Sequence, residues 1–243
     1  MKPAGLTSAV LASAGGVAVA HAGPGITALR PVRRAFCPAL SGQGRADHVA
    51  LTFDDGPDPA ATPRFLDLLA GRGLRATFFL LGSMTASAPG LAAEIAAAGH
   101  ELGVHGYQHR YLVLRSPGAI RDDLSRARDV IAEASGTLPR LFRPPYGVLS
   151  TAALVYARRL RLSPVLWTAW GREWAPGSTP DTVYATLARD LAGGGTVLLH
   201  DSDCTSPPGS WQAALGALPM LLDECERRGL RAGPIADHGI GSG

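Results

Sequence analysis

Short apolar segments alternate with amphipathic helical segments from about residue 46 to the C-terminus. The apolar segments resemble buried strands in composition, and Gly and Pro residues separate them from the helical segments. Strands that alternate with helices form parallel sheets. Seven such units in under 200 residues, with no linker between them, favour a barrel over a long open sheet. The alternation therefore predicts a single-domain α/β fold built around a parallel barrel.

Capping and breaking residues set the expected boundaries. Thr62 with Pro63 begins one helix, and Ser116 with Pro117 begins a longer one that Gly136 ends. Strands are expected at about 48–53, 75–81, 101–104, 141–143, 164–167, 196–199 and 230–235.

Polar and aromatic residues with chemical potential fall repeatedly at the ends of expected strands. In a parallel barrel all carboxyl ends of the strands lie on one face, where such barrels build active sites. Residues far apart in the sequence should therefore meet there. They are Asp54, Asp55, His105, Arg143, the segment 167–174 and His200.

Asp55 and His105 from this set, together with His109, form a candidate metal site. His105 and His109 are four residues apart, so a helical turn would present both imidazoles to one point. With Asp55 they would form a set of two histidines and one carboxylate, which suits zinc, cobalt or iron(II). A pair of histidines at this spacing is weak evidence by itself, and structural histidines are the alternative. His100 is expected to be structural.

The run Asp54-Asp55-Gly56-Pro57-Asp58 also has two interpretations. Asp-Gly-Pro is common in turns, where the acids cap backbone amides. Two adjacent carboxylates at the end of an apolar strand are nevertheless costly to bury without partners. A metal for one and Arg143 for the other would offset that cost, since arginine can hold a carboxylate with two donors.

Composition excludes some classes of protein. Hydrophobic residues make up 46% of the chain and charged residues 18%, which is enough apolar material for a sizeable core. The net charge of +3 and the short basic clusters do not indicate a nucleic-acid partner. Cys37, Cys204 and Cys225 allow one disulfide with a spare thiol or three free thiols, and they do not fix the compartment.

Residues 1–45 are predicted to form a leader and linker ahead of a catalytic domain at 46–243. No charged residue occurs between Ala4 and Leu29, and Ala20-His21-Ala22 resembles a signal-peptidase site. This favours a secreted or membrane-anchored protein, with membrane association through the N-terminal segment. The segment is poor in Leu, Ile and Phe, however, and three arginines follow it at 30–34. A leader that is not exported, a helix packed on the domain and a cytoplasmic location are the alternatives.

Four motifs resemble those of the polysaccharide deacetylases (carbohydrate esterase family four), which include chitooligosaccharide and peptidoglycan deacetylases. They occur in the family's order, and the segment 76–79 resembles the family's second strand. The resemblance spans about 49–235. The motifs are Thr52-Phe53-Asp54-Asp55-Gly56-Pro57, His105-Gly106-Tyr107-Gln108-His109, Arg143-Pro144-Pro145-Tyr146-Gly147 and Leu198-Leu199-His200.

The resemblance implies a distorted (β/α)7 TIM-like barrel that forms a single catalytic domain. It also implies metal-dependent removal of acetyl groups from sugars. The cofactor would be a divalent metal, zinc first and cobalt second, bound by Asp55, His105 and His109. The remaining implied roles are Asp54 as general base, Arg143 as its orienting partner, the Tyr146 amide as oxyanion donor, His200 as general acid, and Leu198 as the lining for the acetyl methyl group.

Two departures from the family pattern bear on these roles. The family has Ser or Thr after the first histidine of the second motif, whereas this chain has Gly106. The metal loop would then be looser or supported by another group. The family also carries aspartates after the fifth strand, whereas Trp170 and Glu173 stand here. Glu173 would pair with His200 and raise its pKa, or it would be a surface residue.

Aromatic residues near these motifs suggest a sugar-binding wall. Trp170, Trp174 and Tyr107 have faces suited to pyranose rings, with barrel packing as the alternative role. Asp201, next to the expected acid, is a candidate for a supporting hydrogen bond.

The leading hypothesis is an enzyme that removes N-acetyl groups from N-acetylglucosamine units of peptidoglycan, chitin-like oligomers or a related acetylated glycan. An O-acetyl esterase acting on xylan-type polymers and a small-molecule glycoconjugate N-deacetylase are alternatives. A non-catalytic carbohydrate-binding module is the alternative from a different class. The sequence leaves the oligomeric state open.

Overall fold

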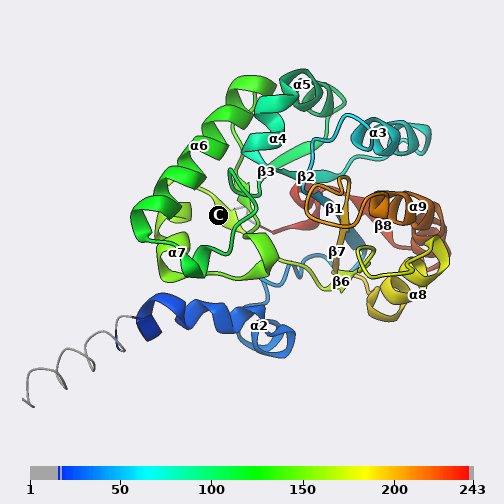
Figure 1. Cartoon of the computed structure of the whole chain (residues 1–243). Coiled ribbons are helices and arrows are strands. Elements are labelled where there is room, and N and C mark those ends of the chain that lie inside the picture. Colours follow the sequence, from blue (N-terminus) through cyan, green and yellow to red (C-terminus); the bar gives the residue numbers. More distant parts are fainter. Residues whose placement is uncertain (1–15, 17, 241–243) are drawn as a thin grey trace, which may run out of the picture.

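The computed structural model describes residue 16 and residues 18–240. A curled parallel sheet forms its centre, with the path β5–β4–β3–β2–β1–β7–β6 and with β8 beside the start of β1 (Figure 1). The strands are His48–Asp54 (β1), Thr77–Leu80 (β2), Glu101–Val104 (β3), Leu141–Phe142 (β4), Ser163–Pro164 (β5), Ala169–Trp170 (β6), Thr196–His200 (β7) and Arg231–Gly233 (β8). Every pairing is parallel, which confirms the predicted α/β barrel-like class.

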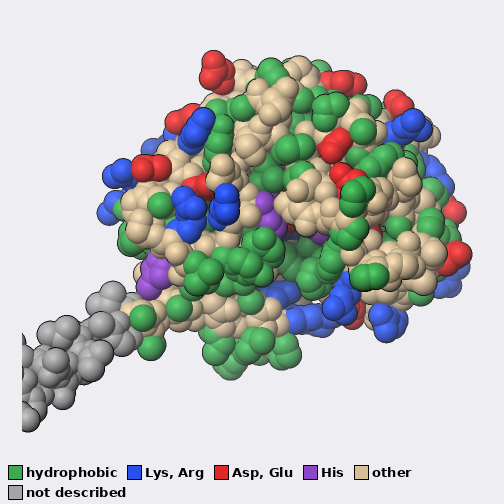
Figure 2. Space-filling view, in the orientation of Figure 1, with side chains coloured by type: hydrophobic (Ala, Val, Ile, Leu, Met, Phe, Trp, Pro, Cys, Tyr) green, Lys and Arg blue, Asp and Glu red, His purple; other side chains and the backbone are tan. Residues whose placement is uncertain are grey.

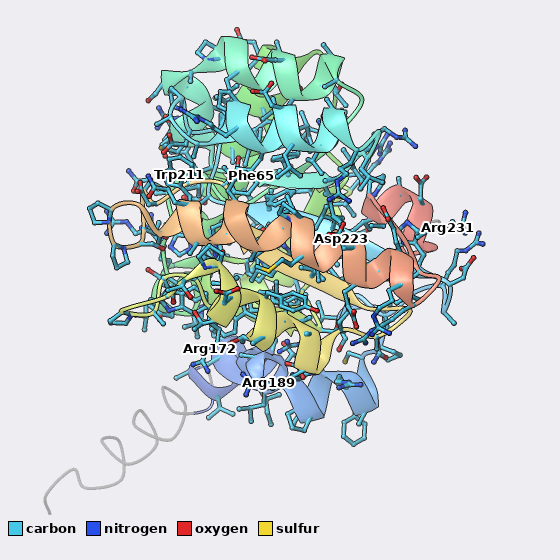
Figure 3. All side chains as sticks on the ribbon, turned by 90° about the vertical axis from the view of Figure 1, so that its right-hand side faces the viewer. Phe65, Arg172, Arg189, Trp211, Asp223 and Arg231 are labelled. Atoms are coloured by element: carbon cyan, nitrogen blue, oxygen red, sulfur yellow. The ribbon has the colours of Figure 1, made fainter. Side chains whose placement is uncertain are left out.

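Helices surround the sheet (Figure 1), and α3, α8 and α9 lie along one side of the molecule (Figure 3). Proline in the first turn begins several of them, as at Pro117 and Pro180. The helix α4 was not expected from the sequence. The α-helices that follow β1 are Thr62–Gly71 (α3), Gly82–Ser87 (α4), Pro89–Ala97 (α5), Pro117–Ser135 (α6), Thr151–Arg159 (α7), Pro180–Asp190 (α8) and Ser210–Arg227 (α9).

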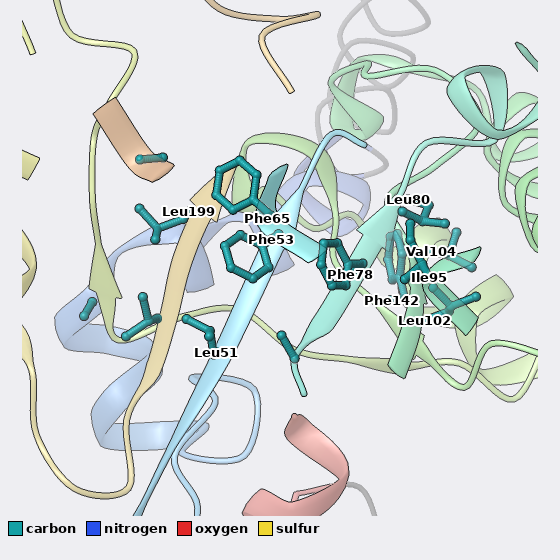
Figure 4. Close-up of a cluster of buried hydrophobic side chains, with 14 of the residues drawn as sticks. Leu51, Phe53, Phe65, Phe78, Leu80, Ile95, Leu102, Val104, Phe142 and Leu199 are labelled. Carbon is teal, nitrogen blue, oxygen red and sulfur yellow. The ribbon is translucent and has the colours of Figure 1, made fainter. Parts of the chain in front are cut away.

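The main hydrophobic core lies between the sheet and the helices (Figure 4). Phe53 is its centre, with ring centroids 5.0 Å from both Phe65 and Phe78. Ala50, on the opposite face of β1, belongs to a second cluster with Phe79. Because successive side chains of a strand point to opposite faces, β1 is buried on both faces, as a continuous apolar run requires.

The register of the sheet brings distant residues to one edge. Asp54 at the end of β1 pairs with His200 at the end of β7, and Val104 pairs with Phe142 just before Arg143. The carboxyl ends of β1, β3, β4 and β7 therefore border one site, as the sequence predicted.

The fifth predicted strand, at 164–167, is not continuous. The chain forms β5 beside β4 and then β6 beside β7, and residues 165–168 bridge the two. In this bridge Leu166 N donates to Leu40 O at 2.8 Å, and the Arg143 side chain donates to the carbonyls of Val165 and Leu166. The Arg143 side chain and the loop at Leu40 thus take the place of neighbouring strands along this bridge, and the barrel is distorted here.

The chain that precedes β1 packs on the barrel next to this bridge. After a 3₁₀ helix at Gly23–Ala28, α2 (Arg30–Phe36) lies beside α8, and Arg30 pairs with Asp190 at 2.5 Å (Figures 1 and 3). Arg33 is buried and donates to Trp167 O at 2.8 Å.

Residues 1–15 and 17 of the predicted leader lie outside the described residues, and the division at residue 45 stays a prediction. Within the described residues, no helix combines the length and apolar character needed to cross a membrane. All three cysteines are free thiols.

Candidate active site

Two adjacent carboxylates occupy the end of β1. Asp54 is 2% exposed and Asp55 is fully buried. Asp55 adopts a left-handed backbone conformation, with φ of 78°. Such a conformation is strained for a residue with a Cβ, and outliers of this kind cluster at functional sites.

Arg143 neutralises the first of these carboxylates. Its fully buried guanidinium donates to Asp54 Oδ1 at 2.7 Å and to Thr52 Oγ1 at 2.7 Å, besides the two carbonyls of the bridge. Burial raises the pKa of Asp54 above its ordinary value, and the charge and hydrogen bond of Arg143 oppose that rise. Asp54 is thus a fixed carboxylate with a pKa shifted toward the range useful for a base.

His105 and His109 converge on the second carboxylate. One nitrogen of each ring and one oxygen of Asp55 all lie within 4.8 Å of one another. The two histidines occupy a loop after β3, so the predicted helical turn is wrong even though the side chains meet. The loop bends at Gly106, where φ is 90°, a conformation that favours glycine.

The donor atoms of this cluster suit a divalent cation. His105 donates from Nδ1 to Arg143 O at 2.8 Å, which leaves Nε2 free to bind. Burial lowers the pKa of His105 to about 3, so the ring is neutral. Asp55 Oδ1 is buried without a hydrogen bond from the described chain, and it lies 3.4 Å from His105 Nε2 and 3.6 Å from His109 Nε2. An orphaned oxygen between two free nitrogens fits a metal.

Two further residues support this cluster, and sequence patterns did not single them out. Thr205, in the loop after β7, donates to Asp55 Oδ2 at 2.6 Å. Asp123 of α6 accepts from Tyr107 N at 2.9 Å and from Gln108 N at 3.3 Å, both in the loop between the histidines. Neither residue belongs to a motif, and both lie far along the chain from their partners, so sequence spacing carried no signal.

His200 faces this cluster across the site. Its Nδ1 lies 2.8 Å from Glu173 Oε1, and Glu173 is 2% exposed, so the alternative of a surface glutamate does not hold. Burial by itself would lower the pKa of His200, but the charge of Glu173 and the hydrogen bond to it outweigh burial and raise it to about 9. The ring is therefore protonated at neutral pH, as a proton donor must be.

Asp201 follows His200, but its side chain bonds to Thr62 at the start of α3 and to none of the candidate catalytic residues, so a supporting role at the site stays a prediction. It is fully buried and accepts from Thr62 Oγ1 at 2.5 Å. Gly56 passes so close that a Cβ there would lie 2.4 Å from Asp201 Oδ2, which explains the glycine after the two acids.

A pocket of about 280 Å³ joins these groups. Figure 2 shows a hollow on this face of the molecule with histidine side chains inside it. Its lining residues are Asp54, His105, His109, Tyr111, Pro144, Tyr146, Gly147, Trp167, Trp170, Trp174, His200, Thr205 and Ser206. A larger open groove, of about 760 Å³ between α3 and α9, contains none of the candidate catalytic residues.

Aromatic rings form two walls of the pocket. Trp170 and Trp174 lie against each other with ring centroids 4.5 Å apart, and both line the pocket. Tyr146 stacks on Tyr111 with ring centroids 3.7 Å apart, and both also line the pocket. Tyr111 was not predicted from the sequence. Tyr146 has a left-handed backbone, with φ of 59°, in the turn after β4.

Two of the predicted pocket residues lie elsewhere. Tyr107 does not line the pocket, because its ring packs under the guanidinium of Arg126 at 3.8 Å. Leu198 is 2% exposed and packs with Leu166 and Trp167 instead of lining the pocket. The loop conformation turns the Tyr107 ring away from the pocket and against the main core. Leu198 shares the face of β7 with His200 but lies two residues deeper, against Trp167.

Comparison with known proteins identifies the family. The polysaccharide deacetylase family matches residues 41–165, which include the three candidate metal ligands, Asp54 and Arg143. A chitooligosaccharide deacetylase of Bradyrhizobium is 34% identical over 198 residues, 77% of this chain and 88% of that protein. A peptidoglycan-N-acetylglucosamine deacetylase of Bacillus cereus is 32% identical over 196 residues, 81% of this chain and 70% of that protein.

Solved structures share the fold. A peptidoglycan N-acetylglucosamine deacetylase superposes with a TM-score of 0.76 at 29% identity, over 83% of this chain and 92% of that one. An acetyl xylan esterase from Clostridium thermocellum, solved with a cobalt ion, superposes with a TM-score of 0.68 at 28% identity, over 78% of this chain and 88% of that one. A family 4 pseudoenzyme from Bacillus anthracis superposes with a TM-score of 0.72 at 26% identity, over 79% of this chain and 65% of that one. The curled parallel barrel, the shared motifs and the extent of these matches agree: the chain belongs to the polysaccharide deacetylase family, carbohydrate esterase family 4.

Proposed function

We propose that this protein is a metal-dependent hydrolase that removes N-acetyl groups from N-acetylglucosamine units of a glycan. The observation that carries the proposal is the convergence of Asp55, His105 and His109 beside Asp54, with protonated His200 on the same pocket. The site thus holds candidates for a metal, a base and an acid, which hydrolysis of an amide requires together.

Asp55, His105 and His109 would hold a divalent cation, zinc first and cobalt second. When bound, the cation would polarise the acetyl carbonyl and make water a stronger nucleophile. The cobalt-containing esterase among the structural relatives supports this assignment.

Asp54 would take the proton from the attacking water. Its Oδ2 lies 3.7 Å from His105 Nε2, so the base borders the ligand set, and Arg143 fixes its other oxygen. His200 would then give a proton to the departing amine nitrogen, because an unprotonated amine is a poor leaving group. The Tyr146 amide would donate to the oxyanion of the tetrahedral intermediate, a contribution of about 3–4 kcal/mol in comparable sites.

The substrate would be an acetylated glycan of the cell envelope or a chitin-like oligomer. The names of the two relatives, which specify peptidoglycan and chitooligosaccharides, support this class. The aromatic pairs Trp170 with Trp174 and Tyr111 with Tyr146, which line the same pocket, suit pyranose rings. We further propose that the protein meets this glycan outside the cytoplasm, by export or anchoring through residues 1–45.

Acetate release with and without metal tests the proposal. The purified protein is treated with chelator, dialysed, and assayed on N-acetylchitooligosaccharides, peptidoglycan and acetylxylan before and after Zn²⁺ or Co²⁺ is restored. We expect loss of acetate release without metal and recovery with it, on an N-acetylated glycan. Release from acetylxylan alone would favour the esterase alternative, and metal binding without release from any substrate would favour the binding module.

Thr205 gives a prediction about the metal ligands. Its hydroxyl makes the only hydrogen bond that the Asp55 carboxylate accepts from the described part of the chain, and it holds Oδ1 toward the two histidines. Thr205→Val should weaken Zn²⁺ affinity by about 10-fold, as loss of a ligand-orienting hydrogen bond does. Thr205→Ser should restore it. Competition with a chromogenic chelator measures the affinities.

Ser202→Ala is the matched control for that prediction, because Ser202 in the same loop donates to Asp58 at 3.2 Å and not to Asp55. An equal loss of affinity in Ser202→Ala would show that the order of the loop, not the Thr205 hydroxyl, supports the metal.

A further inference from the structure

A buried carboxylate on a helix holds the loop between the two histidines. Asp123 of α6 is 9% exposed, and its two oxygens accept from consecutive backbone amides, those of Tyr107 and Gln108. These amides belong to the three-residue segment that joins His105 to His109. A carboxylate that accepts two backbone hydrogen bonds fixes a loop more firmly than a neutral partner, because charge-assisted bonds are about twice as strong.

The conformation of the loop makes such support necessary. Gly106 has φ of 90°, and the residues from 105 to 109 form neither helix nor strand. The His105 amide donates to Leu80 O, and the carbonyls of residues 106 and 107 accept from the first residues of α4. Within the described chain, the amides of Tyr107 and Gln108 have no such backbone acceptor and bond to Asp123 instead. These two amides are only partly buried, so the main consequence of losing Asp123 would be freedom for the loop to adopt conformations that separate the two imidazoles.

The Asp123 carboxylate lies close to the backbone of Gly106. A Cβ built on Gly106 would lie 3.0 Å from Asp123 Oδ2, tighter than ordinary van der Waals contact. A side chain at residue 106 would thus force the carboxylate or the loop to shift by a few tenths of an ångström. Gly106 gives the second motif no hydroxyl after its first histidine. Asp123, 17 positions after Gly106, lies beside the loop at this point.

We propose that Asp123 is the positioning residue for the His105–His109 metal loop, and that it takes the supporting role which Gly106 cannot have. The proposal rests on the proposed metal site. Among the described residues Asp123 has no hydrogen bond to either ligand ring, so it acts through the backbone of Tyr107 and Gln108. Its function is to hold the two imidazoles at the separation that one cation requires.

Metal binding by the full chain tests this role. Zn²⁺ affinity of Asp123→Ala should fall 10–100-fold, the usual effect of removing a partner that orients ligands. Asp123→Asn keeps the shape of the side chain and one acceptor oxygen, so its Zn²⁺ affinity should fall less than that of Asp123→Ala. Asp122→Ala removes a neighbouring exposed carboxylate of the same helix, and its affinity should equal that of the wild type.

Absorption of the Co²⁺-loaded protein gives a second readout, because a change in ligand geometry alters the visible spectrum whereas a loss of stability alone does not. We expect a changed spectrum for Asp123→Ala and a wild-type spectrum for Asp122→Ala. Wild-type affinity and spectrum in Asp123→Ala would overturn the proposal and leave the metal site intact. Failure of the wild type itself to bind Zn²⁺ or Co²⁺ would instead overturn the proposed function.

Discussion

Asp54→Asn should lower acetate release by about 10²–10⁴-fold, the usual contribution of a general base. Asparagine keeps an oxygen for Arg143, which now donates to Asp54 Oδ1 at 2.7 Å, but it has no basic oxygen to accept a proton from water. Zn²⁺ affinity should remain close to that of the wild type, because the proposed ligand set consists of Asp55, His105 and His109 and does not include Asp54. Single-turnover acetate release and chelator competition measure the two effects.

Stability needs its own control in this experiment, because Asp54→Asn leaves the buried Arg143 charge without an anionic partner. Breaking a buried ion pair costs about 3–5 kcal/mol, so the melting temperature should fall. Thr52→Val removes another hydrogen-bond partner of Arg143 without removing the base. It should lower stability and keep most of the activity. Substantial acetate release by metal-loaded Asp54→Asn would show that another group is the base.

Glu173→Gln should move the alkaline limb of the pH–activity profile to lower pH. His200 must be protonated to act as the acid, and its pKa is about 9 because Glu173 outweighs the effect of burial. Glutamine removes the charge, and burial would then hold the pKa at or below the ordinary value of about 6.5. The protonated fraction at pH 8 would fall roughly 30-fold, and kcat/KM would fall with it.

The profile of kcat/KM between pH 5 and pH 10 measures this shift. At the acidic end His200 is protonated in both proteins, so the difference should shrink as pH falls. Glu94→Gln, which removes an exposed carboxylate on α5, should leave the profile unchanged. An unshifted alkaline limb in Glu173→Gln would mean that His200 is not the acid or that Glu173 does not set its pKa.

The sequence determined the fold class and the position of the chemistry. Alternation of apolar strands with helices is a local property, and parallel strands must place their carboxyl ends on one side. Asp54 and His200 therefore meet whatever the loops do. The motif resemblance further indicated Arg143 as the partner of Asp54, and the structure brings the two together.

Only the tertiary structure decided how the site is supported and lined. Leu40 and Arg143 replace strand partners at the break between β5 and β6, and Asp123 and Thr205 support the candidate metal ligands from other elements. These contacts, including the one between Leu166 and Leu40, join residues that are 15 to 150 positions apart in the sequence. They depend on loop conformations that carry no periodicity, so local propensity does not encode them. The same loops turn Tyr107 away from the pocket and bring Tyr111 into it, because side-chain direction in irregular segments follows from packing, not from spacing.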